Sequence, residues 1–277
     1  MDETARDAPE TGPDPLEGDG SAPRGEADAY RRMFRSHERE RARRSGWATA
    51  IADLLAAHVA PRSVVDVGCG LGFFLAAMSV RGAERLTGLD ADWIAGHDTE
   101  IPRERYVLHD LEHPLPPVGR HDLAVCLEVA EHLSEARGPG LVADLTGLSD
   151  LVLFSAAIPG QGGRGHVNCR WQSYWAGLFA ERGFAGYDPF RRHLAAVPGM
   201  APWFAQNLLL FAREGAGLPA SLLPHRIAPE AADMVSPHYH RRILGAKDRH
   251  FRAAVEQLHA AGLRYVPPAK RAAQGPA

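Results

Sequence analysis

The segment VVDVGCGLGFF, residues 64–74, constrains the fold more than any other part of the chain. An apolar strand containing Asp66 runs into Gly68, Gly70 and Gly72, and the pattern predicts a helix from Phe73 to about Arg81. A sharp strand-to-helix turn needs positive φ angles, and a ligand close to the backbone leaves no room for Cβ atoms. The glycine spacing differs from the G-x-G-x-x-G of dinucleotide sites, and a carboxylate beside the loop would repel a pyrophosphate. The segment therefore predicts a binding loop for a different kind of ligand.

Strand-like and helix-like segments alternate after this loop, which is typical of parallel strands joined by crossover helices. The sequence predicts an α/β fold with a seven-stranded, mostly parallel sheet whose last strand is antiparallel. Helices are expected on both faces, with N-terminal helices before the sheet, a helix from about Ser134 and a C-terminal helical extension. The expected strands are 63–68, 86–90, 105–110, 121–129, 151–158, 184–190 and 207–213.

Three regions follow from length and composition. The chain has 277 residues and is 45% hydrophobic, which suits one core of ordinary domain size with terminal extensions. Residues 1–27 contain few large apolar side chains and are predicted to be a disordered tail. Residues 28–215 are predicted to form the α/β domain with its N-terminal helices. Residues 216–277 are predicted to be a loop, with a helix from near His240 to about Ala261 that packs on the domain, forms part of a lid or contacts a second subunit.

The charge and the cysteine content limit the kinds of binding partner and the cellular compartment that we expect. Acidic residues number 34 against 31 basic ones, so no overall positive field gathers nucleic acid or an anionic membrane. The three cysteines form no CxxC pair, and the N-terminus has no apolar run of the kind found in signal peptides. We expect a cytoplasmic protein with a small-molecule substrate, no nucleic acid and no membrane partner. The oligomeric state is open, and the terminal helices offer one route to a homodimer.

Two further acidic residues lie at the ends of the next two predicted strands. Asp90 ends the strand LTGLD, where an acid can accept hydrogen bonds from both hydroxyls of a ribose. Asp110 ends the next strand and can accept from an adenine amino group, while Leu111 packs on the ring. With DVGCGLG, LTGLD, HDL and HDLAVCLEVAEHL in this order, residues from about Ser63 to Leu133 resemble the class I, Rossmann-like S-adenosylmethionine-dependent methyltransferases. The resemblance extends more loosely to NLLLFAR.

The resemblance implies S-adenosyl-L-methionine as the cofactor and S-adenosyl-L-homocysteine as its product. Asp66 would then hold the ammonium of the methionine part, directly or through water. The cofactor-binding residues that it implies are Asp66, Gly68, Cys69, Gly70, Gly72, Asp90, Ala91, Asp110, Leu111 and Glu128.

Three candidate catalytic residues follow the fourth strand, at the edge where open α/β sheets bind ligands. His132 is the leading candidate for a general base, because its unperturbed pKa lies near neutrality. The alternative is a structural histidine that bonds a loop carbonyl. Glu128 would contact the cofactor or the substrate, and Glu131 would orient His132 or cap the helix.

A metal site is a second interpretation of the same residues. Two carboxylates and two imidazoles resemble the cluster with which small-RNA 2′-O-methyltransferases bind a magnesium-class ion. The residues are Glu128, Glu131, His132 and His166. The pattern E-V-x-E-H also occurs in family members that bind no metal, so no metal is the prediction and this set is the alternative.

The expected substrate residues are His166, Asn168 and Trp171 after the fifth strand, with Tyr30 and Phe34 from the N-terminal helix. Trp175 and Phe179 fit better as the buried side of a helix.

The predicted function is methyl transfer from S-adenosylmethionine to an oxygen or nitrogen of a small molecule, in natural-product or sugar modification. The reaction is an in-line displacement, with general-base help from His132. Three alternatives remain. One is another use of the cofactor, aminocarboxypropyl transfer or cyclisation; another is a metal-dependent RNA 2′-O-methyltransferase; the third is a non-catalytic cofactor-binding protein.

Overall fold

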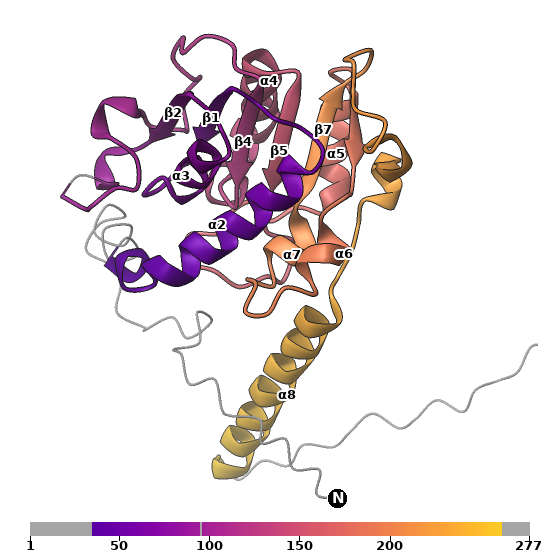
Figure 1. Ribbon diagram of the computed structural model, residues 1–277. Coiled ribbons are helices and arrows are strands. Elements are labelled where there is room, and N and C mark those ends of the chain that lie inside the picture. Colours follow the sequence, from indigo (N-terminus) through magenta and orange to yellow (C-terminus); the bar gives the residue numbers. More distant parts are fainter. Residues whose placement is uncertain (1–34, 95, 262–277) are drawn as a thin grey trace, which may run out of the picture. The chain divides into compact units, whose positions relative to one another are not determined.

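The computed structural model describes residues 35–94 and 96–261 (Figure 1). The chain divides into two compact units between Met234 and Val235, and each is described here by itself. The predicted tail 1–27 and the predicted substrate residues Tyr30 and Phe34 lie outside the described residues. No helix within the described ranges is long and apolar enough to cross a membrane.

The first unit is built on one eight-stranded mixed sheet. Its strand order is β3-β2-β1-β4-β5-β7-β6-β8. The five strands from β3 to β5 are parallel, whereas the pairs β5–β7, β7–β6 and β6–β8 are antiparallel. The strands are β1 Ser63–Val67, β2 Arg85–Asp90, β3 Tyr106–Leu108, β4 Leu123–Leu127, β5 Leu151–Ser155, β6 Phe184–Tyr187, β7 Leu209–Arg213 and β8 Arg226–Ile227.

The predicted α/β class and the antiparallel strand at 207–213 are confirmed, but the predicted number of seven strands is wrong. The eighth strand, β8, has only two residues and lies in the segment that the sequence assigns to a loop. It pairs with β6 through Gly186–Ile227 and Tyr187–Arg226. A two-residue edge strand flanked by prolines carries no alternation for a sequence pattern to detect.

Helices cover both faces of the sheet (Figure 1). Helix α3 begins at Phe73 as predicted, whereas the helix expected from Ser134 begins later. A 3-10 turn occupies Glu135–Arg137, and the α-helix starts at Gly138 with a proline in its first turn. The helices of this unit are α2 Arg41–Ala56, α3 Phe73–Val80, α4 Gly138–Leu148, α5 Gln172–Ala180, α6 Arg191–Leu194 and α7 Phe204–Asn207.

The core lies in two layers, because successive residues of a strand point to opposite faces. Val64 of β1 packs in the layer with Ile51 of α2 and Leu75 of α3. Its neighbour Val65 packs in the layer with α4 and α5. Trp175 and Phe179 of α5 are 2% and 0% exposed in this second layer, which confirms their predicted structural role. Phe179 stacks on Phe211 of β7 with ring centroids 4.0 Å apart.

The chain between β7 and the second unit is fastened to the first unit. Arg191 Nη1 donates to the Ala232 carbonyl over 2.7 Å, and Ser173 N donates to Asp233 Oδ1 over 2.7 Å. The division into compact units therefore falls after Met234. The second unit contains helix α8, Pro237–Ala260, whose N-cap residue Ser236 accepts a hydrogen bond from Tyr239 N.

Candidate functional site

The candidate site lies at the edge where β1, β2, β4 and β5 end. Ligands of open α/β sheets bind outside the carboxyl ends of the parallel strands. Because β7 runs antiparallel to β5, its first residues reach this same edge. The residues that follow β1, β2, β4 and β5 and those that precede β7 therefore meet there.

The glycine loop has the backbone that its sequence requires. Gly68, Gly70 and Gly72 have φ values of 79°, 53° and 86°, in the left-handed region that disfavours side chains. A Cβ atom at Gly68 would lie 2.3 Å from Val129 Cγ2, and one at Gly72 would lie 2.5 Å from the Tyr106 hydroxyl. No other residue fits these two positions without displacing its neighbours.

Asp66 and Asp90 place two buried carboxyl groups beside this loop. They are 4% and 7% exposed, respectively. Burial, with a smaller contribution from the charge of Asp90, raises the pKa of Asp66 to about 8. Burial also raises the pKa of Asp90, against hydrogen bonds from Gly70 N, Ala91 N and Trp93 Nε1. Two neighbouring buried acids of this kind are stabilised by a ligand that brings a positive charge or hydroxyl donors.

Asp110 differs from these two acids. Its side chain is 61% exposed, Oδ1 accepts a hydrogen bond from Glu112 N over 3.0 Å, and Oδ2 lies 3.3 Å from His113 Nδ1. Leu111, next to it, is buried. The structure thus brings Asp66, Asp90, Cys69 and Ala91 together around the loop and leaves Asp110 at an exposed turn after β3.

Glu128 is held in an unusual conformation directly after β4. Among the described residues it is the only one other than glycine with a positive φ, 55°. Its carboxylate accepts hydrogen bonds from Gln161 Nε2 over 2.9 Å and from Asn207 Nδ2 over 3.1 Å. Asn207 Nδ2 also lies 2.9 Å from Gln161 Oε1. Residues that follow β4, follow β5 and precede β7 thus form one polar cluster.

Glu131 brings a second carboxyl group into this cluster. It is fully buried, and neither of its oxygens accepts a hydrogen bond from a nitrogen or hydroxyl donor among the described residues. Burial and then the charge of Glu128 raise the pKa of Glu131 well above its usual range. The side chain does not cap a helix, which is one of the two roles that the sequence offers for it.

The imidazoles of His132 and His166 lie beside Glu131. Their ring centroids are 4.8 Å apart in an edge-to-face arrangement, and His166 Nε2 lies 4.0 Å from Glu131 Oε1. One ligand atom from each of Glu131, His132 and His166 falls within 4.8 Å of the others. Burial and then His166 lower the pKa of His132 to about 4, and burial lowers that of His166. Both rings are therefore neutral at pH 7, with a lone pair available to accept a proton or to bind a metal.

The segment after β5 is anchored to the backbone of Glu131. Val167 N and Asn168 N both donate to the Glu131 carbonyl, over 2.9 and 3.0 Å. His166 Nδ1 lies 3.2 Å from the Gln161 carbonyl oxygen, and a Cβ atom at Gly163 would lie 2.1 Å from His166 Nε2. The absence of a side chain at Gly163 therefore leaves the room that the imidazole occupies.

The predicted substrate residues differ in what they offer to a ligand. Asn168 is 2% exposed, and its side chain accepts from Arg170 Nε and donates to the Ala130 carbonyl. Trp171, by contrast, is 41% exposed at the start of α5. His166 reaches the carboxylate cluster, Asn168 is used within the protein, and Trp171 presents its ring to solvent.

Gln161 and Asn207 were not predicted from the sequence. Gln161 lies in a glycine-rich loop, and Asn207 directly precedes the apolar run LLLF of β7. A polar residue at the entrance of an antiparallel strand that neighbours β5 reaches the ligand-binding edge. That signal is available in a sequence once the last strand is known to be antiparallel.

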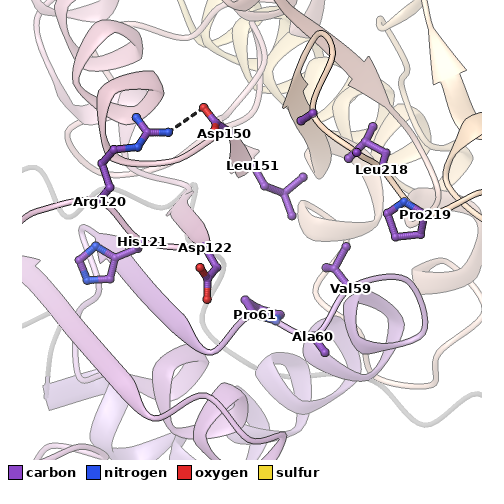
Figure 2. Close-up of a pocket in the computed structure, with 12 residues that line it drawn as sticks. Val59, Ala60, Pro61, Arg120, His121, Asp122, Asp150, Leu151, Leu218 and Pro219 are labelled. Atoms are coloured by element: carbon purple, nitrogen blue, oxygen red, sulfur yellow. Dashed lines mark hydrogen bonds and ion pairs between the residues drawn. The ribbon is translucent and has the colours of Figure 1, made fainter.

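A cavity of about 510 Å³ lies at the opposite edge of the sheet, at the amino ends of β1, β4 and β5 (Figure 2). Its polar groups are satisfied within the protein. Arg120 pairs with Asp150 over 2.7 Å, and Asp122 accepts hydrogen bonds from Arg62 N and Ser63 N. Among the described residues, none of the predicted site residues lines this cavity, so the carboxyl edge remains the candidate site.

The comparisons agree with this geometry. Residues 37–138 match a family model described as a methyltransferase domain. The segment that holds the glycine loop, Asp66, Asp90 and Glu128 therefore matches a methyltransferase domain. No curated protein matches the chain.

Several solved structures are similar in fold. A candidate O-methyltransferase from Nostoc punctiforme is 15% identical, with a TM-score of 0.52 over 68% of this chain and 61% of that one. An O-methyltransferase family protein from Burkholderia thailandensis is 14% identical, with a TM-score of 0.44 over 69% and 60%. Human N-acetylserotonin methyltransferase in complex with SAM is 15% identical, with a TM-score of 0.41 over 68% and 54%. The chain thus spans 54–61% of the length of these three proteins.

Proposed function

We propose that the protein transfers the methyl group of S-adenosyl-L-methionine to an oxygen or nitrogen of a small molecule. The buried pair Asp66 and Asp90 beside the glycine loop is the observation that supports this most directly. Burying two carboxyl groups side by side costs free energy, which is recovered when one meets an ammonium and the other meets hydroxyl donors. A methionine moiety and a ribose carry these groups. The residues present therefore fit this cofactor.

Each residue has a role in holding the cofactor. Asp66 binds the ammonium group, and Asp90 accepts from the ribose hydroxyls, since its carboxylate is already oriented by Gly70 N and Ala91 N. Gly68 and Gly72 let Val129 and Tyr106 pack directly against the loop, which holds the loop in its tight turn beside Asp66 and Asp90. Leu111 packs on the adenine, and Asp110 accepts from its amino group.

The cofactor, when bound, supplies an electrophilic methyl group. The protein then has to orient the acceptor, exclude water and remove a proton. His132 serves as the proton acceptor through its place beside Glu131 and His166. Burial lowers its pKa to about 4, so it is a weaker base than a histidine with the unperturbed pKa on which the sequence prediction relied. Gln161 and Asn207 hold the Glu128 carboxylate in place, so that it can orient the acceptor or the methionine part of the cofactor.

The acceptor is proposed to be a small molecule of the natural-product or sugar type. The fold-level similarity to O-methyltransferases supports an oxygen acceptor by analogy alone. The exposed ring of Trp171 offers one surface for such an acceptor.

The test is calorimetric titration with S-adenosylhomocysteine, followed by mass analysis of the products formed from S-adenosylmethionine with an acceptor panel. We expect binding in the wild type and a loss of affinity in Asp90→Ala and Asp66→Asn. A mass gain of one methyl group on the acceptor identifies methyl transfer. An aminocarboxypropyl adduct, a cyclised product, or cofactor turnover without a methylated acceptor would overturn the proposed reaction.

A second candidate adds a divalent cation at Glu131, His132 and His166, with Glu128 beside them. The fully buried Glu131 carboxylate without a donor favours it, as does the 4.8 Å grouping of the three ligand atoms. Carboxylate and neutral imidazole are ligands that divalent transition metals accept. Such an ion would bind the acceptor oxygens, as expected for a metal-dependent 2′-O-methyltransferase.

Manganese titration followed by electron paramagnetic resonance, with turnover measured in a chelator, separates the two candidates. Stoichiometric binding that is lost in His166→Ala and Glu131→Gln would support the cation. No binding, together with full turnover in a chelator, would leave the metal-free reaction.

A further inference from the structure

Helix α8 carries a charge opposite in sign to that of the chain as a whole. Its sequence PHYHRRILGAKDRHFRAAVEQLHA contains five arginine or lysine residues and two acids, a net charge of +3, whereas the chain has a net charge of -3. Basic amphipathic helices with four to eight arginine or lysine residues bind anionic lipid headgroups. The net charge of the whole chain therefore does not reveal the positive charge of this helix.

An apolar row runs along α8. Leu244, Phe251, Val255 and Leu258 follow one another at intervals of seven, four and three residues, which keeps them on one side of an α-helix. Leu244 and Phe251 are 49% and 50% exposed, and Val255 and Leu258 are partly exposed. The row covers four turns of the helix and is far less apolar than a membrane-spanning segment.

Cationic side chains stand on both sides of this row. At about 100° per residue, Lys247 lies about 60° to one side of Leu244. On the other side Arg241 and Arg252 lie about 60–80° away, and the acid Asp248 lies between them and the row, at about 40°. All four are exposed. One margin of the row is therefore cationic, and the other carries two cations and one acid.

We propose that α8 lies in the interfacial plane of an anionic membrane, with its apolar row among the acyl chains and its cationic side chains on the headgroups. This proposal goes beyond the proposed function and does not depend on it. The net charge of +3 favours this occupant over a second copy of the helix, because the second copy would carry the same positive charge. A nucleic acid would use the cations and gain nothing from the exposed Leu244 and Phe251.

The experiment uses the full chain and sedimentation with vesicles of phosphatidylcholine, alone or mixed with an equal part of phosphatidylglycerol. We expect at least tenfold stronger partitioning to the mixed vesicles at low salt, and a loss of most of that difference at high salt. Leu244→Asp should weaken the partitioning about tenfold. Gln257→Asp makes the same change of charge about 140° away on the helix and should weaken it less than threefold.

Circular dichroism and thermal melting check that the variants remain folded, and Lys247→Glu tests the margin separately. Equal losses in Leu244→Asp and Gln257→Asp would overturn the proposal, because charge alone would then explain the binding. It would also be overturned by equal partitioning to both kinds of vesicle. Binding of an RNA oligomer without vesicle binding would do the same, as would a dimer in sedimentation velocity that Leu244→Asp dissociates in the absence of vesicle binding.

Discussion

Binding of S-adenosylhomocysteine should release a proton from Asp66. With a pKa of about 8 in the empty protein, this carboxyl is ionised in roughly one molecule in ten at pH 7. The ammonium of the ligand needs the ionised form, so binding at pH 7 should release about 0.9 proton. Affinity should rise nearly tenfold per pH unit from pH 6 to pH 7 and become level above pH 8. Each pH unit in this range corresponds to about 1.4 kcal/mol of binding free energy.

Calorimetry at pH 7 in two buffers of different ionisation enthalpy measures the released proton directly. Asp66→Asn has no proton to lose, so it should bind more weakly, with heats that do not depend on the buffer. Asp110→Asn is the matched control, because it removes an exposed carboxylate at a neighbouring strand end and should leave the proton release unchanged. Binding of the wild type without proton release, or release that persists in Asp66→Asn, would refute the reasoning.

The same pKa has a consequence for the stability of the empty protein. A carboxyl whose folded pKa is raised stabilises the fold fully below its unfolded pKa, and this contribution is lost as the pH rises through the folded value. For Asp66 this window runs from 3.8 to about 8. Because the ligand restores a favourable partner, it should raise the melting temperature more at pH 8 than at pH 6. Thermal melts at the two pH values check the sign.

Four other outcomes are expected. Asp90→Ala should lower the binding free energy of S-adenosylhomocysteine by about 1–3 kcal/mol, measured by calorimetry, because charged hydrogen bonds are lost; unchanged affinity would contradict its assignment to the ribose. His132→Ala should lower turnover about 10²–10⁴-fold and leave that affinity nearly intact, as steady-state kinetics would show; normal turnover would exclude it as the base. Gly163→Ala should displace His166, because the added Cβ atom would overlap its ring, and should lower turnover with little effect on cofactor affinity. Wild-type kinetics would show that neighbouring residues shift to accommodate the added methyl group. Phe179→Ala should cost about 3–5 kcal/mol of unfolding free energy in urea denaturation, because it opens a cavity beneath β7; a loss below about 1 kcal/mol would contradict the packing.

The cofactor loop was predictable from the sequence because its determinants are local. The glycines of the loop, the strand before it and the helix at Phe73 depend on backbone sterics within a dozen residues, and the structure has all three. The order in which the acidic residues follow the strands can likewise be read directly from the sequence. The resemblance to methyltransferases therefore followed from short motifs, and a methyltransferase-domain model matches residues 37–138.

The second half of the site depends on contacts that span long stretches of chain. Asn207 meets Glu128 across 79 residues, and Gln161 meets Glu128 across 33. No periodicity in the sequence reports such pairs, because they follow from the insertion of β7 beside β5. The predicted acids Glu128 and Glu131 were therefore visible, whereas the amides that orient one of them were not. The two-residue strand β8 was missed for a related reason, since only its pairing with β6 defines it.

The left-handed backbone conformation of Glu128 affects which substitutions this position can accept. A left-handed conformation costs a residue with a Cβ atom about 1–2 kcal/mol, which glycine avoids. A Glu128→Gly substitution would relieve that cost, but it would also leave the buried side-chain amides of Gln161 and Asn207 without the carboxylate to which they donate, and a buried donor without its acceptor costs about 1–3 kcal/mol. The two effects are of similar size and opposite sign. A screen for thermal stability should therefore recover glycine at this position only together with substitutions at Gln161 or Asn207, so the strain at Glu128 is retained by these two amides as well as by the reaction.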